Sequence, residues 1–217
     1  NKIKVSGSII EDMPKNTTFF DDIRFFEKEF DGVMPLEIMI DTKRKNGAMK
    51  LSNLRRMEEL EQTIMDIPEL SKPLSVVNIA KSFNQAYYNG NPEYYSLPSS
   101  QEEIFLLPYI KNSLKNSKEN QLKSYITADG SVARMTTFIK DENGEKMESI
   151  EAHIRNKVNK LFPSPRYEVI ITGKPSVFQK GTKYLLDNLL SSLLFAFALT
   201  GGLVAIMFRS LKMVLVS

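Results

Sequence analysis

One uncharged run near the C-terminus constrains this chain more than any other feature. The run from Leu189 to Phe208 (LLSSLLFAFALTGGLVAIMF) holds twenty residues and no Asp, Glu, Lys or Arg. A helix rises about 1.5 Å per residue, so this run would span roughly 30 Å, the thickness of the hydrocarbon core of a bilayer. The alternative is a buried helix in a soluble core, but the run is too long for a domain of this size. We therefore predict that one helix over residues 176–208 enters and crosses a membrane.

The rest of the chain has the composition of a soluble domain. Its 217 residues are 25% charged and have a mean hydropathy of -0.24, which excludes a chain built mostly of membrane helices. The absence of cysteine rules out disulfides, iron–sulfur clusters and thiol catalysis. The net charge is only +3, with Lys and Arg scattered among Asp and Glu. The sequence therefore shows no basic stripe and predicts no nucleic-acid partner.

Hydrophobic periodicity predicts the elements of that domain. Strands are expected over residues 36–42, 72–78, 122–128, 132–140 and 167–172, and helices over 16–30, 52–67 (with Ser52 as N-cap), 79–88, 102–114 and 145–162. The order strand, helix, strand occurs twice in this series. We therefore expect an α+β domain of two ferredoxin-like βαβ repeats, with helices on one face of one sheet and a helical insertion over residues 79–121.

Both ends suggest that the chain is a fragment of a longer protein. Residues 1–16 lack the apolar core of a signal peptide, so either the chain faces the cytoplasm or an upstream segment is missing. After the uncharged run, a polar turn with Arg209 and Lys212 leads to a new apolar run from Met213 to Val216, like the start of a second span. Positive residues in short turns stay in the cytoplasm. Arg209 and Lys212 therefore place residues 209–217 on the cytoplasmic side and the domain outside.

Small residues recur along the predicted span at intervals of four. The pairs are Ser192 and Ala196, Ala198 and Gly202, and Gly201 and Ala205. Such spacing lets two helix backbones approach closely in a membrane. The alternative is that Gly and Ala are simply common in spans. We predict that this face packs against other transmembrane helices.

Aromatic residues are concentrated in the predicted insertion. They are Tyr87, Tyr88, Tyr94, Tyr95, Phe105 and Tyr109. One interpretation is a groove for an apolar ligand. The other, which we favour, is a small satellite core, because aromatic residues supply core packing more often than binding sites.

No pattern in the sequence predicts catalysis, a metal or a cofactor. The run from Gly173 to Ser176 is not a phosphate-binding loop, because Glu168 stands where the first glycine is needed and Pro175 removes an N–H donor. His153 is the only histidine, so no second His or Cys can share a metal with it. Paired carboxylates occur at Asp21/Asp22, Glu58/Glu59 and Glu102/Glu103, but adjacent helical residues point in different directions. We predict that the chain is not an enzyme.

Several short words of the sequence carry a family resemblance. They are DMPKN from Asp12, FFE from Phe25, FDGVMPLEI from Phe30, and FRS from Phe208 after the uncharged run. Together they resemble the segment between the first and second membrane helices of resistance-nodulation-division (RND) exporters, above all the MMPL and hopanoid-exporter branch. The resemblance covers nearly the whole chain.

The resemblance implies a proton-driven exporter of hydrophobic or lipid-like molecules in the bacterial inner membrane. Residues 1–35 would be an N-terminal extracytoplasmic segment, and residues 36–175 a porter-like domain on the periplasmic side. Its partners would be the lipid bilayer, other transmembrane helices of the same full-length protein, and a hydrophobic substrate. The proton-coupling acids of the family lie in later helices, so no catalytic residue carries over. The alternative is a single-span membrane-anchored sensor or ligand-binding domain.

Overall fold

The computed structural model describes residues 13–104, 108, 124–142 and 144–208. The chain forms two compact units, Asn1–Ser176 and Val177–Ser217, and each is described on its own. The first unit is an α+β domain. The second consists of the greater part of one long helix.

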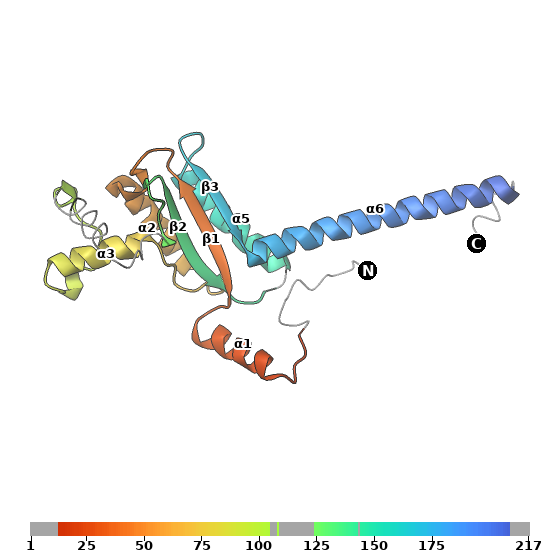
Figure 1. Ribbon diagram of the computed structural model, residues 1–217, viewed down its shortest axis with the longest axis horizontal. Coiled ribbons are helices and arrows are strands. Elements are labelled where there is room, and N and C mark those ends of the chain that lie inside the picture. Colours follow the sequence, from red (N-terminus) through yellow and green to blue (C-terminus); the bar gives the residue numbers. More distant parts are fainter. Residues whose placement is uncertain (1–12, 105–107, 109–123, 143, 209–217) are drawn as a thin grey trace. The chain divides into compact units, whose positions relative to one another are not determined.

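A three-stranded antiparallel sheet forms the centre of the α+β domain. Its strands are β1 (Met34–Asp41), β2 (Val132–Ile139) and β3 (Glu168–Gly173), in the order β2-β1-β3 (Figure 1). The register pairs Ile38 with Met135 on one side and with Ile171 on the other. Alternate residues of a strand point to opposite faces. All three of these residues are buried, so they define the core face of the sheet.

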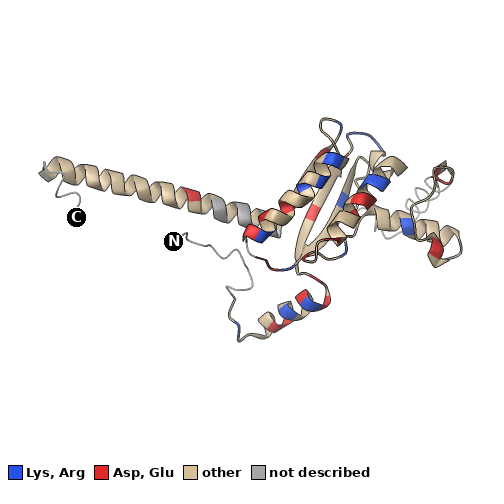
Figure 2. Ribbon diagram, turned by 180° about the vertical axis from the view of Figure 1, so that it is seen from behind, with Lys and Arg blue, Asp and Glu red and all other residues tan. Residues whose placement is uncertain are grey.

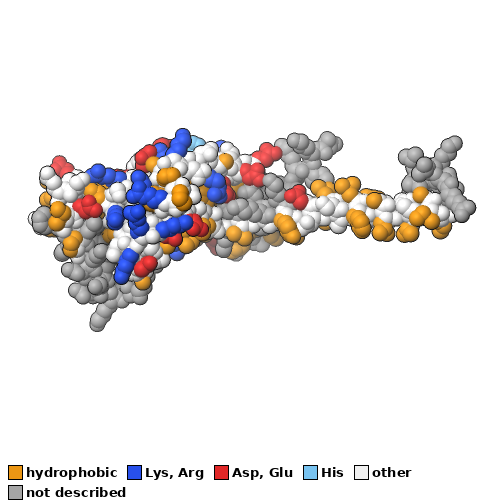
Figure 3. Space-filling model, turned by 90° about the horizontal axis from the view of Figure 1, so that it is seen from above, with side chains coloured by type: hydrophobic (Ala, Val, Ile, Leu, Met, Phe, Trp, Pro, Cys, Tyr) orange, Lys and Arg blue, Asp and Glu red, His pale blue; other side chains and the backbone are white. Residues whose placement is uncertain are grey.

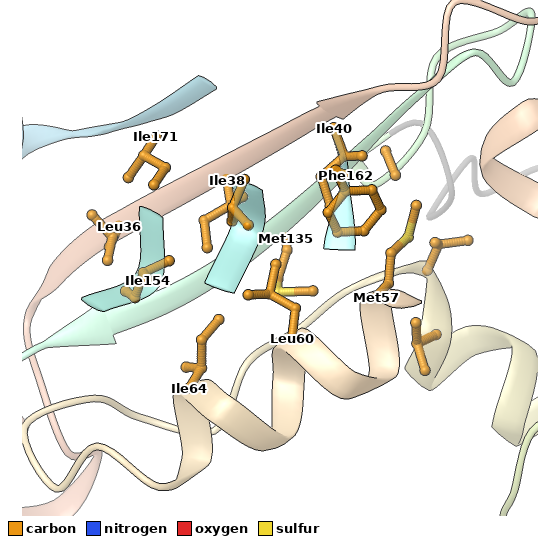
Figure 4. Packing of buried hydrophobic residues seen from close by; sticks show 14 of the residues in the cluster. Leu36, Ile38, Ile40, Met57, Leu60, Ile64, Met135, Ile154, Phe162 and Ile171 are labelled. Atoms are coloured by element: carbon orange, nitrogen blue, oxygen red, sulfur yellow. The ribbon is translucent and has the colours of Figure 1, made fainter. Parts of the chain in front are cut away.

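Two helices cover that core face. Helix α2 (Leu51–Met65) and helix α5 (Gly144–Leu161) each bury one apolar stripe, at the helical spacing that the sequence predicts. Figure 4 shows Ile38 of β1 among side chains from α2 that include Leu60 and Ile64. These three side chains have no exposed surface.

Four further described elements flank these two layers. Helix α1 (Thr18–Glu29) precedes the sheet, and helix α3 (Val76–Tyr87) follows α2. Two short 3-10 turns complete the described domain, η1 (Gly47–Met49) and η2 (Pro92–Tyr94). Of these four elements, α3 and η1 add buried residues to the core.

The structure confirms the α+β class and most of the predicted elements. The predicted strands over 36–42, 132–140 and 167–172, and the predicted helices over 16–30, 52–67, 79–88 and 145–162, appear with shifted ends. Helix α2 begins after Lys50 rather than after the expected N-cap Ser52. Residues 105–107 and 109–114 of the predicted helix over 102–114 lie outside the described residues.

Two predicted strands are not found as strands in the described residues. Over 72–78, the side chain of Ser75 caps α3, so the chain turns helical at Val76, and Leu74 forms only an isolated bridge to β2. Over 124–128, only Ile126 pairs with β2, again as an isolated bridge. The two ferredoxin-like repeats are therefore not confirmed.

Helix α6 (Lys174–Phe208) is 35 residues long, and all of it from Val177 onward lies in the second unit. Within it, Tyr184–Met207 has a mean hydropathy of 2.2 over its most apolar window, and none of that window is buried. In Figure 3 apolar side chains cover much of this helix. In the described part of the chain, α6 is the one helix long and apolar enough to cross a membrane, as the sequence predicts.

Neighbouring residues on β1 give a direct test of which sheet face is the core. Ile38 has no exposed surface, whereas Met39 is 39% exposed on the other face. Ile38→Ala should lower the free energy of unfolding by about 2–5 kcal/mol, because it leaves a cavity among packed side chains. Met39→Ala should lower it by about 0.5 kcal/mol or less, as is usual for surface substitutions. Urea unfolding in detergent micelles, followed by tyrosine fluorescence, measures both, and equal losses would contradict the assignment.

Candidate functional site

Helix α1 exposes an aromatic surface. Thr17 caps the N-terminus of the helix, and its Oγ1 accepts a hydrogen bond from the backbone N–H of Phe20 at 3.3 Å. Asp21 in the first turn and Lys28 in the last turn suit the helix dipole. No residue of α1 is buried, and the large side chains left more than half exposed are Phe19, Phe25 and Phe26, with Phe30 just after the helix.

A glycine brings the turn after α1 against the end of β2. Gly32 has φ +149°, and a Cβ there would lie 2.8 Å from backbone atoms of Phe138 and Ile139. Only glycine fits both the conformation and the close approach. Next to it, Asp31 pairs with Lys140 at 3.5 Å.

A second contact ties α1 itself to the same place. The carboxylate of Glu27 accepts a hydrogen bond from the backbone N–H of Asp141 at 2.8 Å. Glycine, ion pair and hydrogen bond together hold α1 beside the end of β2. This arrangement leaves a pocket between them.

The pocket has a volume of about 610 Å³. Ligand pockets in proteins usually measure roughly 300–1,000 Å³ and are mostly apolar. The walls come from four separate parts of the domain: Ile23, Phe26 and Phe30 from α1 and its end, Asp31, Gly32 and Val33 from the turn, Ser71, Lys72 and Leu74 from the segment before α3, and Phe138 from β2. The site is therefore largely hydrocarbon and aromatic.

The few polar groups in these walls are mostly occupied. Ser71 Oγ accepts from the backbone N–H of Phe138 at 2.9 Å and lies 3.4 Å from Thr137 Oγ1. Asp31 is paired with Lys140. Lys72 is exposed, and the described residues show no ion pair for it. The pocket thus offers apolar surface and one lysine, which suits an apolar ligand.

The described residues of the aromatic insertion are not among those that line this pocket. Tyr88 stacks on Tyr94 at 3.8 Å between ring centroids and meets Tyr87 edge-on at 5.3 Å. The hydroxyl of Tyr88 donates to the carboxylate of Glu102, and this bond raises the pKa of Tyr88 to about 12.

These tyrosines form a surface stack rather than a buried core. Tyr87, Tyr94 and Tyr95 are 54%, 37% and 42% exposed. The favoured interpretation, a satellite core, therefore does not describe these residues. Phe105 and Tyr109 lie outside the described residues. The apolar groove remains a prediction.

The small residues of the predicted span all lie on α6. Ser192 Oγ donates to the backbone carbonyl of Leu189 at 2.9 Å, and a Cβ on Gly202 would meet no atom within 4 Å. Ala196, Ala198, Gly201 and Ala205 occupy the same helix. Their packing against other spans stays a prediction, and Arg209 and Lys212 fall outside the described residues.

One buried acid escaped the sequence analysis. Glu61 is only 3% exposed and accepts a hydrogen bond from Ser75 Oγ at 2.5 Å. Burial raises the pKa of this carboxyl. Ser75 and Asn78 form a capping box, which starts a helix where a strand was expected from the sequence. This pair was the sequence signal that could have placed Ser75 beside Glu61. No three His, Cys, Asp or Glu side chains of the described chain are grouped as a metal would require.

No protein-family model matches the sequence, and no curated protein matches it. The resemblance to RND exporters therefore rests on the runs DMPKN, FFE, FDGVMPLEI and FRS of the sequence.

Glu61 makes stability depend on pH in a direction that can be tested. Burial raises the pKa of folded Glu61 above the ordinary 4.5. The contribution of Glu61 to the stability of the domain is therefore largest below pH 4.5, where Glu61 is neutral in both the folded and the unfolded chain. This contribution to the free energy of unfolding falls as the pH rises through the raised pKa of the folded state, because the buried carboxyl must then ionise. Glu61→Gln stays neutral and keeps an oxygen for Ser75. We expect this variant to be more stable than wild type at pH 8 and equally stable at pH 4, by urea unfolding at both.

The exposed carboxyl of Glu93 provides the control. Glu93→Gln removes one acid of the same kind from the surface of the domain, and we expect it to behave like wild type at both pH values. A Glu61→Gln variant that is less stable than wild type at pH 8 would contradict the account.

Proposed function

We propose that this chain is the first extracytoplasmic porter domain and the second membrane helix of an RND-type exporter. The exporter moves hydrophobic or lipid-like molecules, is driven by protons, and lies in the bacterial inner membrane with this domain on the periplasmic side. One observation carries most of the proposal: an α+β domain runs directly into a helix that can cross a membrane. Strand β3 ends at Gly173, and α6 begins at Lys174.

The connections of the domain support a ferredoxin-like unit with one irregular edge. Helix α2 links β1 to the segment before α3, and α5 links β2 to β3. In that segment Leu70 and Leu74 make isolated antiparallel bridges to Ile139 and Thr136, along the edge of β2 that β1 leaves free. This is where a fourth strand would complete such a sheet. Pro73 lies between the two bridges and has no N–H to donate, which accounts for the break.

The pocket supports an apolar substrate. Phe26, Phe30 and Leu74 line it and remain 52%, 59% and 46% exposed. Covering such side chains with an apolar ligand is favourable, at about 25 cal/mol per Å² removed from water. We therefore place the contact between the domain and the transported molecule in this pocket.

A single-span sensor or ligand-binding domain is the second candidate. The pocket would serve it equally well as a ligand site. The two candidates differ in whether the bound molecule leaves the cell.

The experiment compares two neighbouring phenylalanines of α1 in the full-length protein. Phe26 lines the pocket, whereas Phe25 is similarly exposed, at 58%, but does not. The protein is expressed in an efflux-deficient bacterium, and accumulation of Nile red, a hydrophobic dye, is measured. We expect wild type and Phe25→Ser to lower accumulation several-fold, and Phe26→Ser to lose most of that effect because a polar side chain replaces part of the apolar wall.

Dissipating the proton gradient should abolish the difference between wild type and empty vector. If expression never changes accumulation while the dye still binds the purified protein, the exporter proposal fails and the binding-domain candidate gains support. If both Ser variants export like wild type, the substrate does not use this pocket.

A further inference from the structure

Basic side chains from three distant segments meet at the end of the sheet opposite to where α6 begins. The segments are the loop 42–50 after β1, the first turns of α2, and the end of α5 with its turn to residue 167. We call this region the basic end. Figure 1 shows the loops at the ends of β1 and α5 at the top, and Figure 3, which looks down on that side, shows Lys and Arg side chains gathered there.

A chain of hydrogen bonds holds the three segments together. Asn53 Nδ2 donates to the carbonyl of Gly47 at 2.7 Å, which ties the loop to α2. The hydroxyl of Tyr167 donates to Asn53 Oδ1 at 2.8 Å, and Arg56 Nη1 donates to that hydroxyl at 2.5 Å. The guanidinium groups of Arg56 and Arg166 both lie over the Tyr167 ring, 5.4 and 5.6 Å from its centroid.

Further hydrogen bonds fix the loop to the turn before β2. Thr42 Oγ1 donates to the carbonyl of Ser131 at 2.7 Å, and the N–H of Ala48 donates to the carbonyl of Gly130 at 3.0 Å. The positive charges therefore sit on a fixed framework. A framework that is already ordered loses less entropy when a partner binds.

The acids beside the basic end each accept a hydrogen bond or form an ion pair, whereas most of its bases have no ion pair among the described residues. Asp41 accepts from the N–H of Lys43, Glu103 from that of Leu51, Asp129 from Thr127 and Ser131, and Glu168 pairs with Lys43. In contrast, six exposed bases have no ion pair among the described residues: Arg44, Lys45, Lys50, Arg55, Lys160 and Arg166. The whole chain has a net charge of only +3, so this end holds a local excess.

We infer that the basic end is an interaction surface for a carboxylate-rich surface of a partner protein. Three of the six unpaired bases are arginines, whose planar guanidinium suits a carboxylate. Among the described residues, the exposed large aromatic side chains come from α1 and its end, the end of α3 with the turn after it, and α6, and not from the three segments of the basic end, so these segments offer no stacking platform for single-stranded nucleic acid. A soluble acidic protein therefore fits better than single-stranded nucleic acid.

The test measures binding of a fluorescein-labelled poly-L-glutamate peptide to the whole chain in neutral-lipid nanodiscs at about 0.15 M salt, where screening acts beyond ~8 Å. Lys45→Glu/Arg166→Glu should weaken binding at least tenfold. The matched control Lys15→Glu/Lys28→Glu makes the same change of net charge at exposed positions elsewhere and should change binding less than twofold. Circular dichroism checks that both variants are folded.

Two further probes separate the alternatives. Single-stranded DNA and vesicles containing phosphatidylglycerol are tested with the same variants. Weaker binding of both probes than of the peptide supports the inference. Equal effects of the two double variants, tighter binding of DNA or vesicles, or no measurable binding of the peptide would overturn it.

Discussion

The burial of one face of β1 is the constraint on which the domain depends. Ile38 and Ile40 have no exposed surface, and they pack between neighbouring strands and the helices α2 and α5. A shift of one residue in register would turn these side chains to the open face. Because β1 pairs with both other strands, its register sets theirs.

The two candidate interaction regions, the apolar pocket and the basic end, lie at the two ends of β1. At the Met34 end, Gly32 allows the chain to approach β2 closely, and α1 then lies beside the sheet and leaves the apolar pocket. At the Asp41 end, the loop to α2 is bonded to the turn before β2, and the basic end forms around Tyr167. The core face gives rigidity, while the two ends differ sharply in chemistry. Figure 2 shows how Lys, Arg, Asp and Glu alternate along the helices between them, as expected for solvated faces.

Local patterns predicted the elements well, and non-local contacts explain what they missed. The alternation of buried and exposed residues in β1 and the apolar stripes of α2 and α5 are set by residues close together in the sequence, so the sequence alone predicted them. The strand predicted over 72–78 was wrong because Val76 and Val77 have strand propensity, but the Ser75–Asn78 capping box starts a helix. The pocket and the basic end were missed because their residues lie far apart in the chain. Lys45 and Arg166, for example, belong to distant segments that are joined by the hydrogen bonds of Asn53 and Tyr167.

The most direct test of the account asks where the domain and α6 lie relative to a membrane. The chain has no cysteine, so a single introduced cysteine can be labelled without background. Ser52→Cys lies on the exposed surface of the domain, and Leu194→Cys lies within the candidate span. With a membrane-impermeant maleimide on spheroplasts, we predict that Ser52→Cys is labelled and that Leu194→Cys stays unlabelled until the membrane is dissolved. Labelling of Leu194→Cys in intact membranes, or of Ser52→Cys only after permeabilisation, would contradict the account.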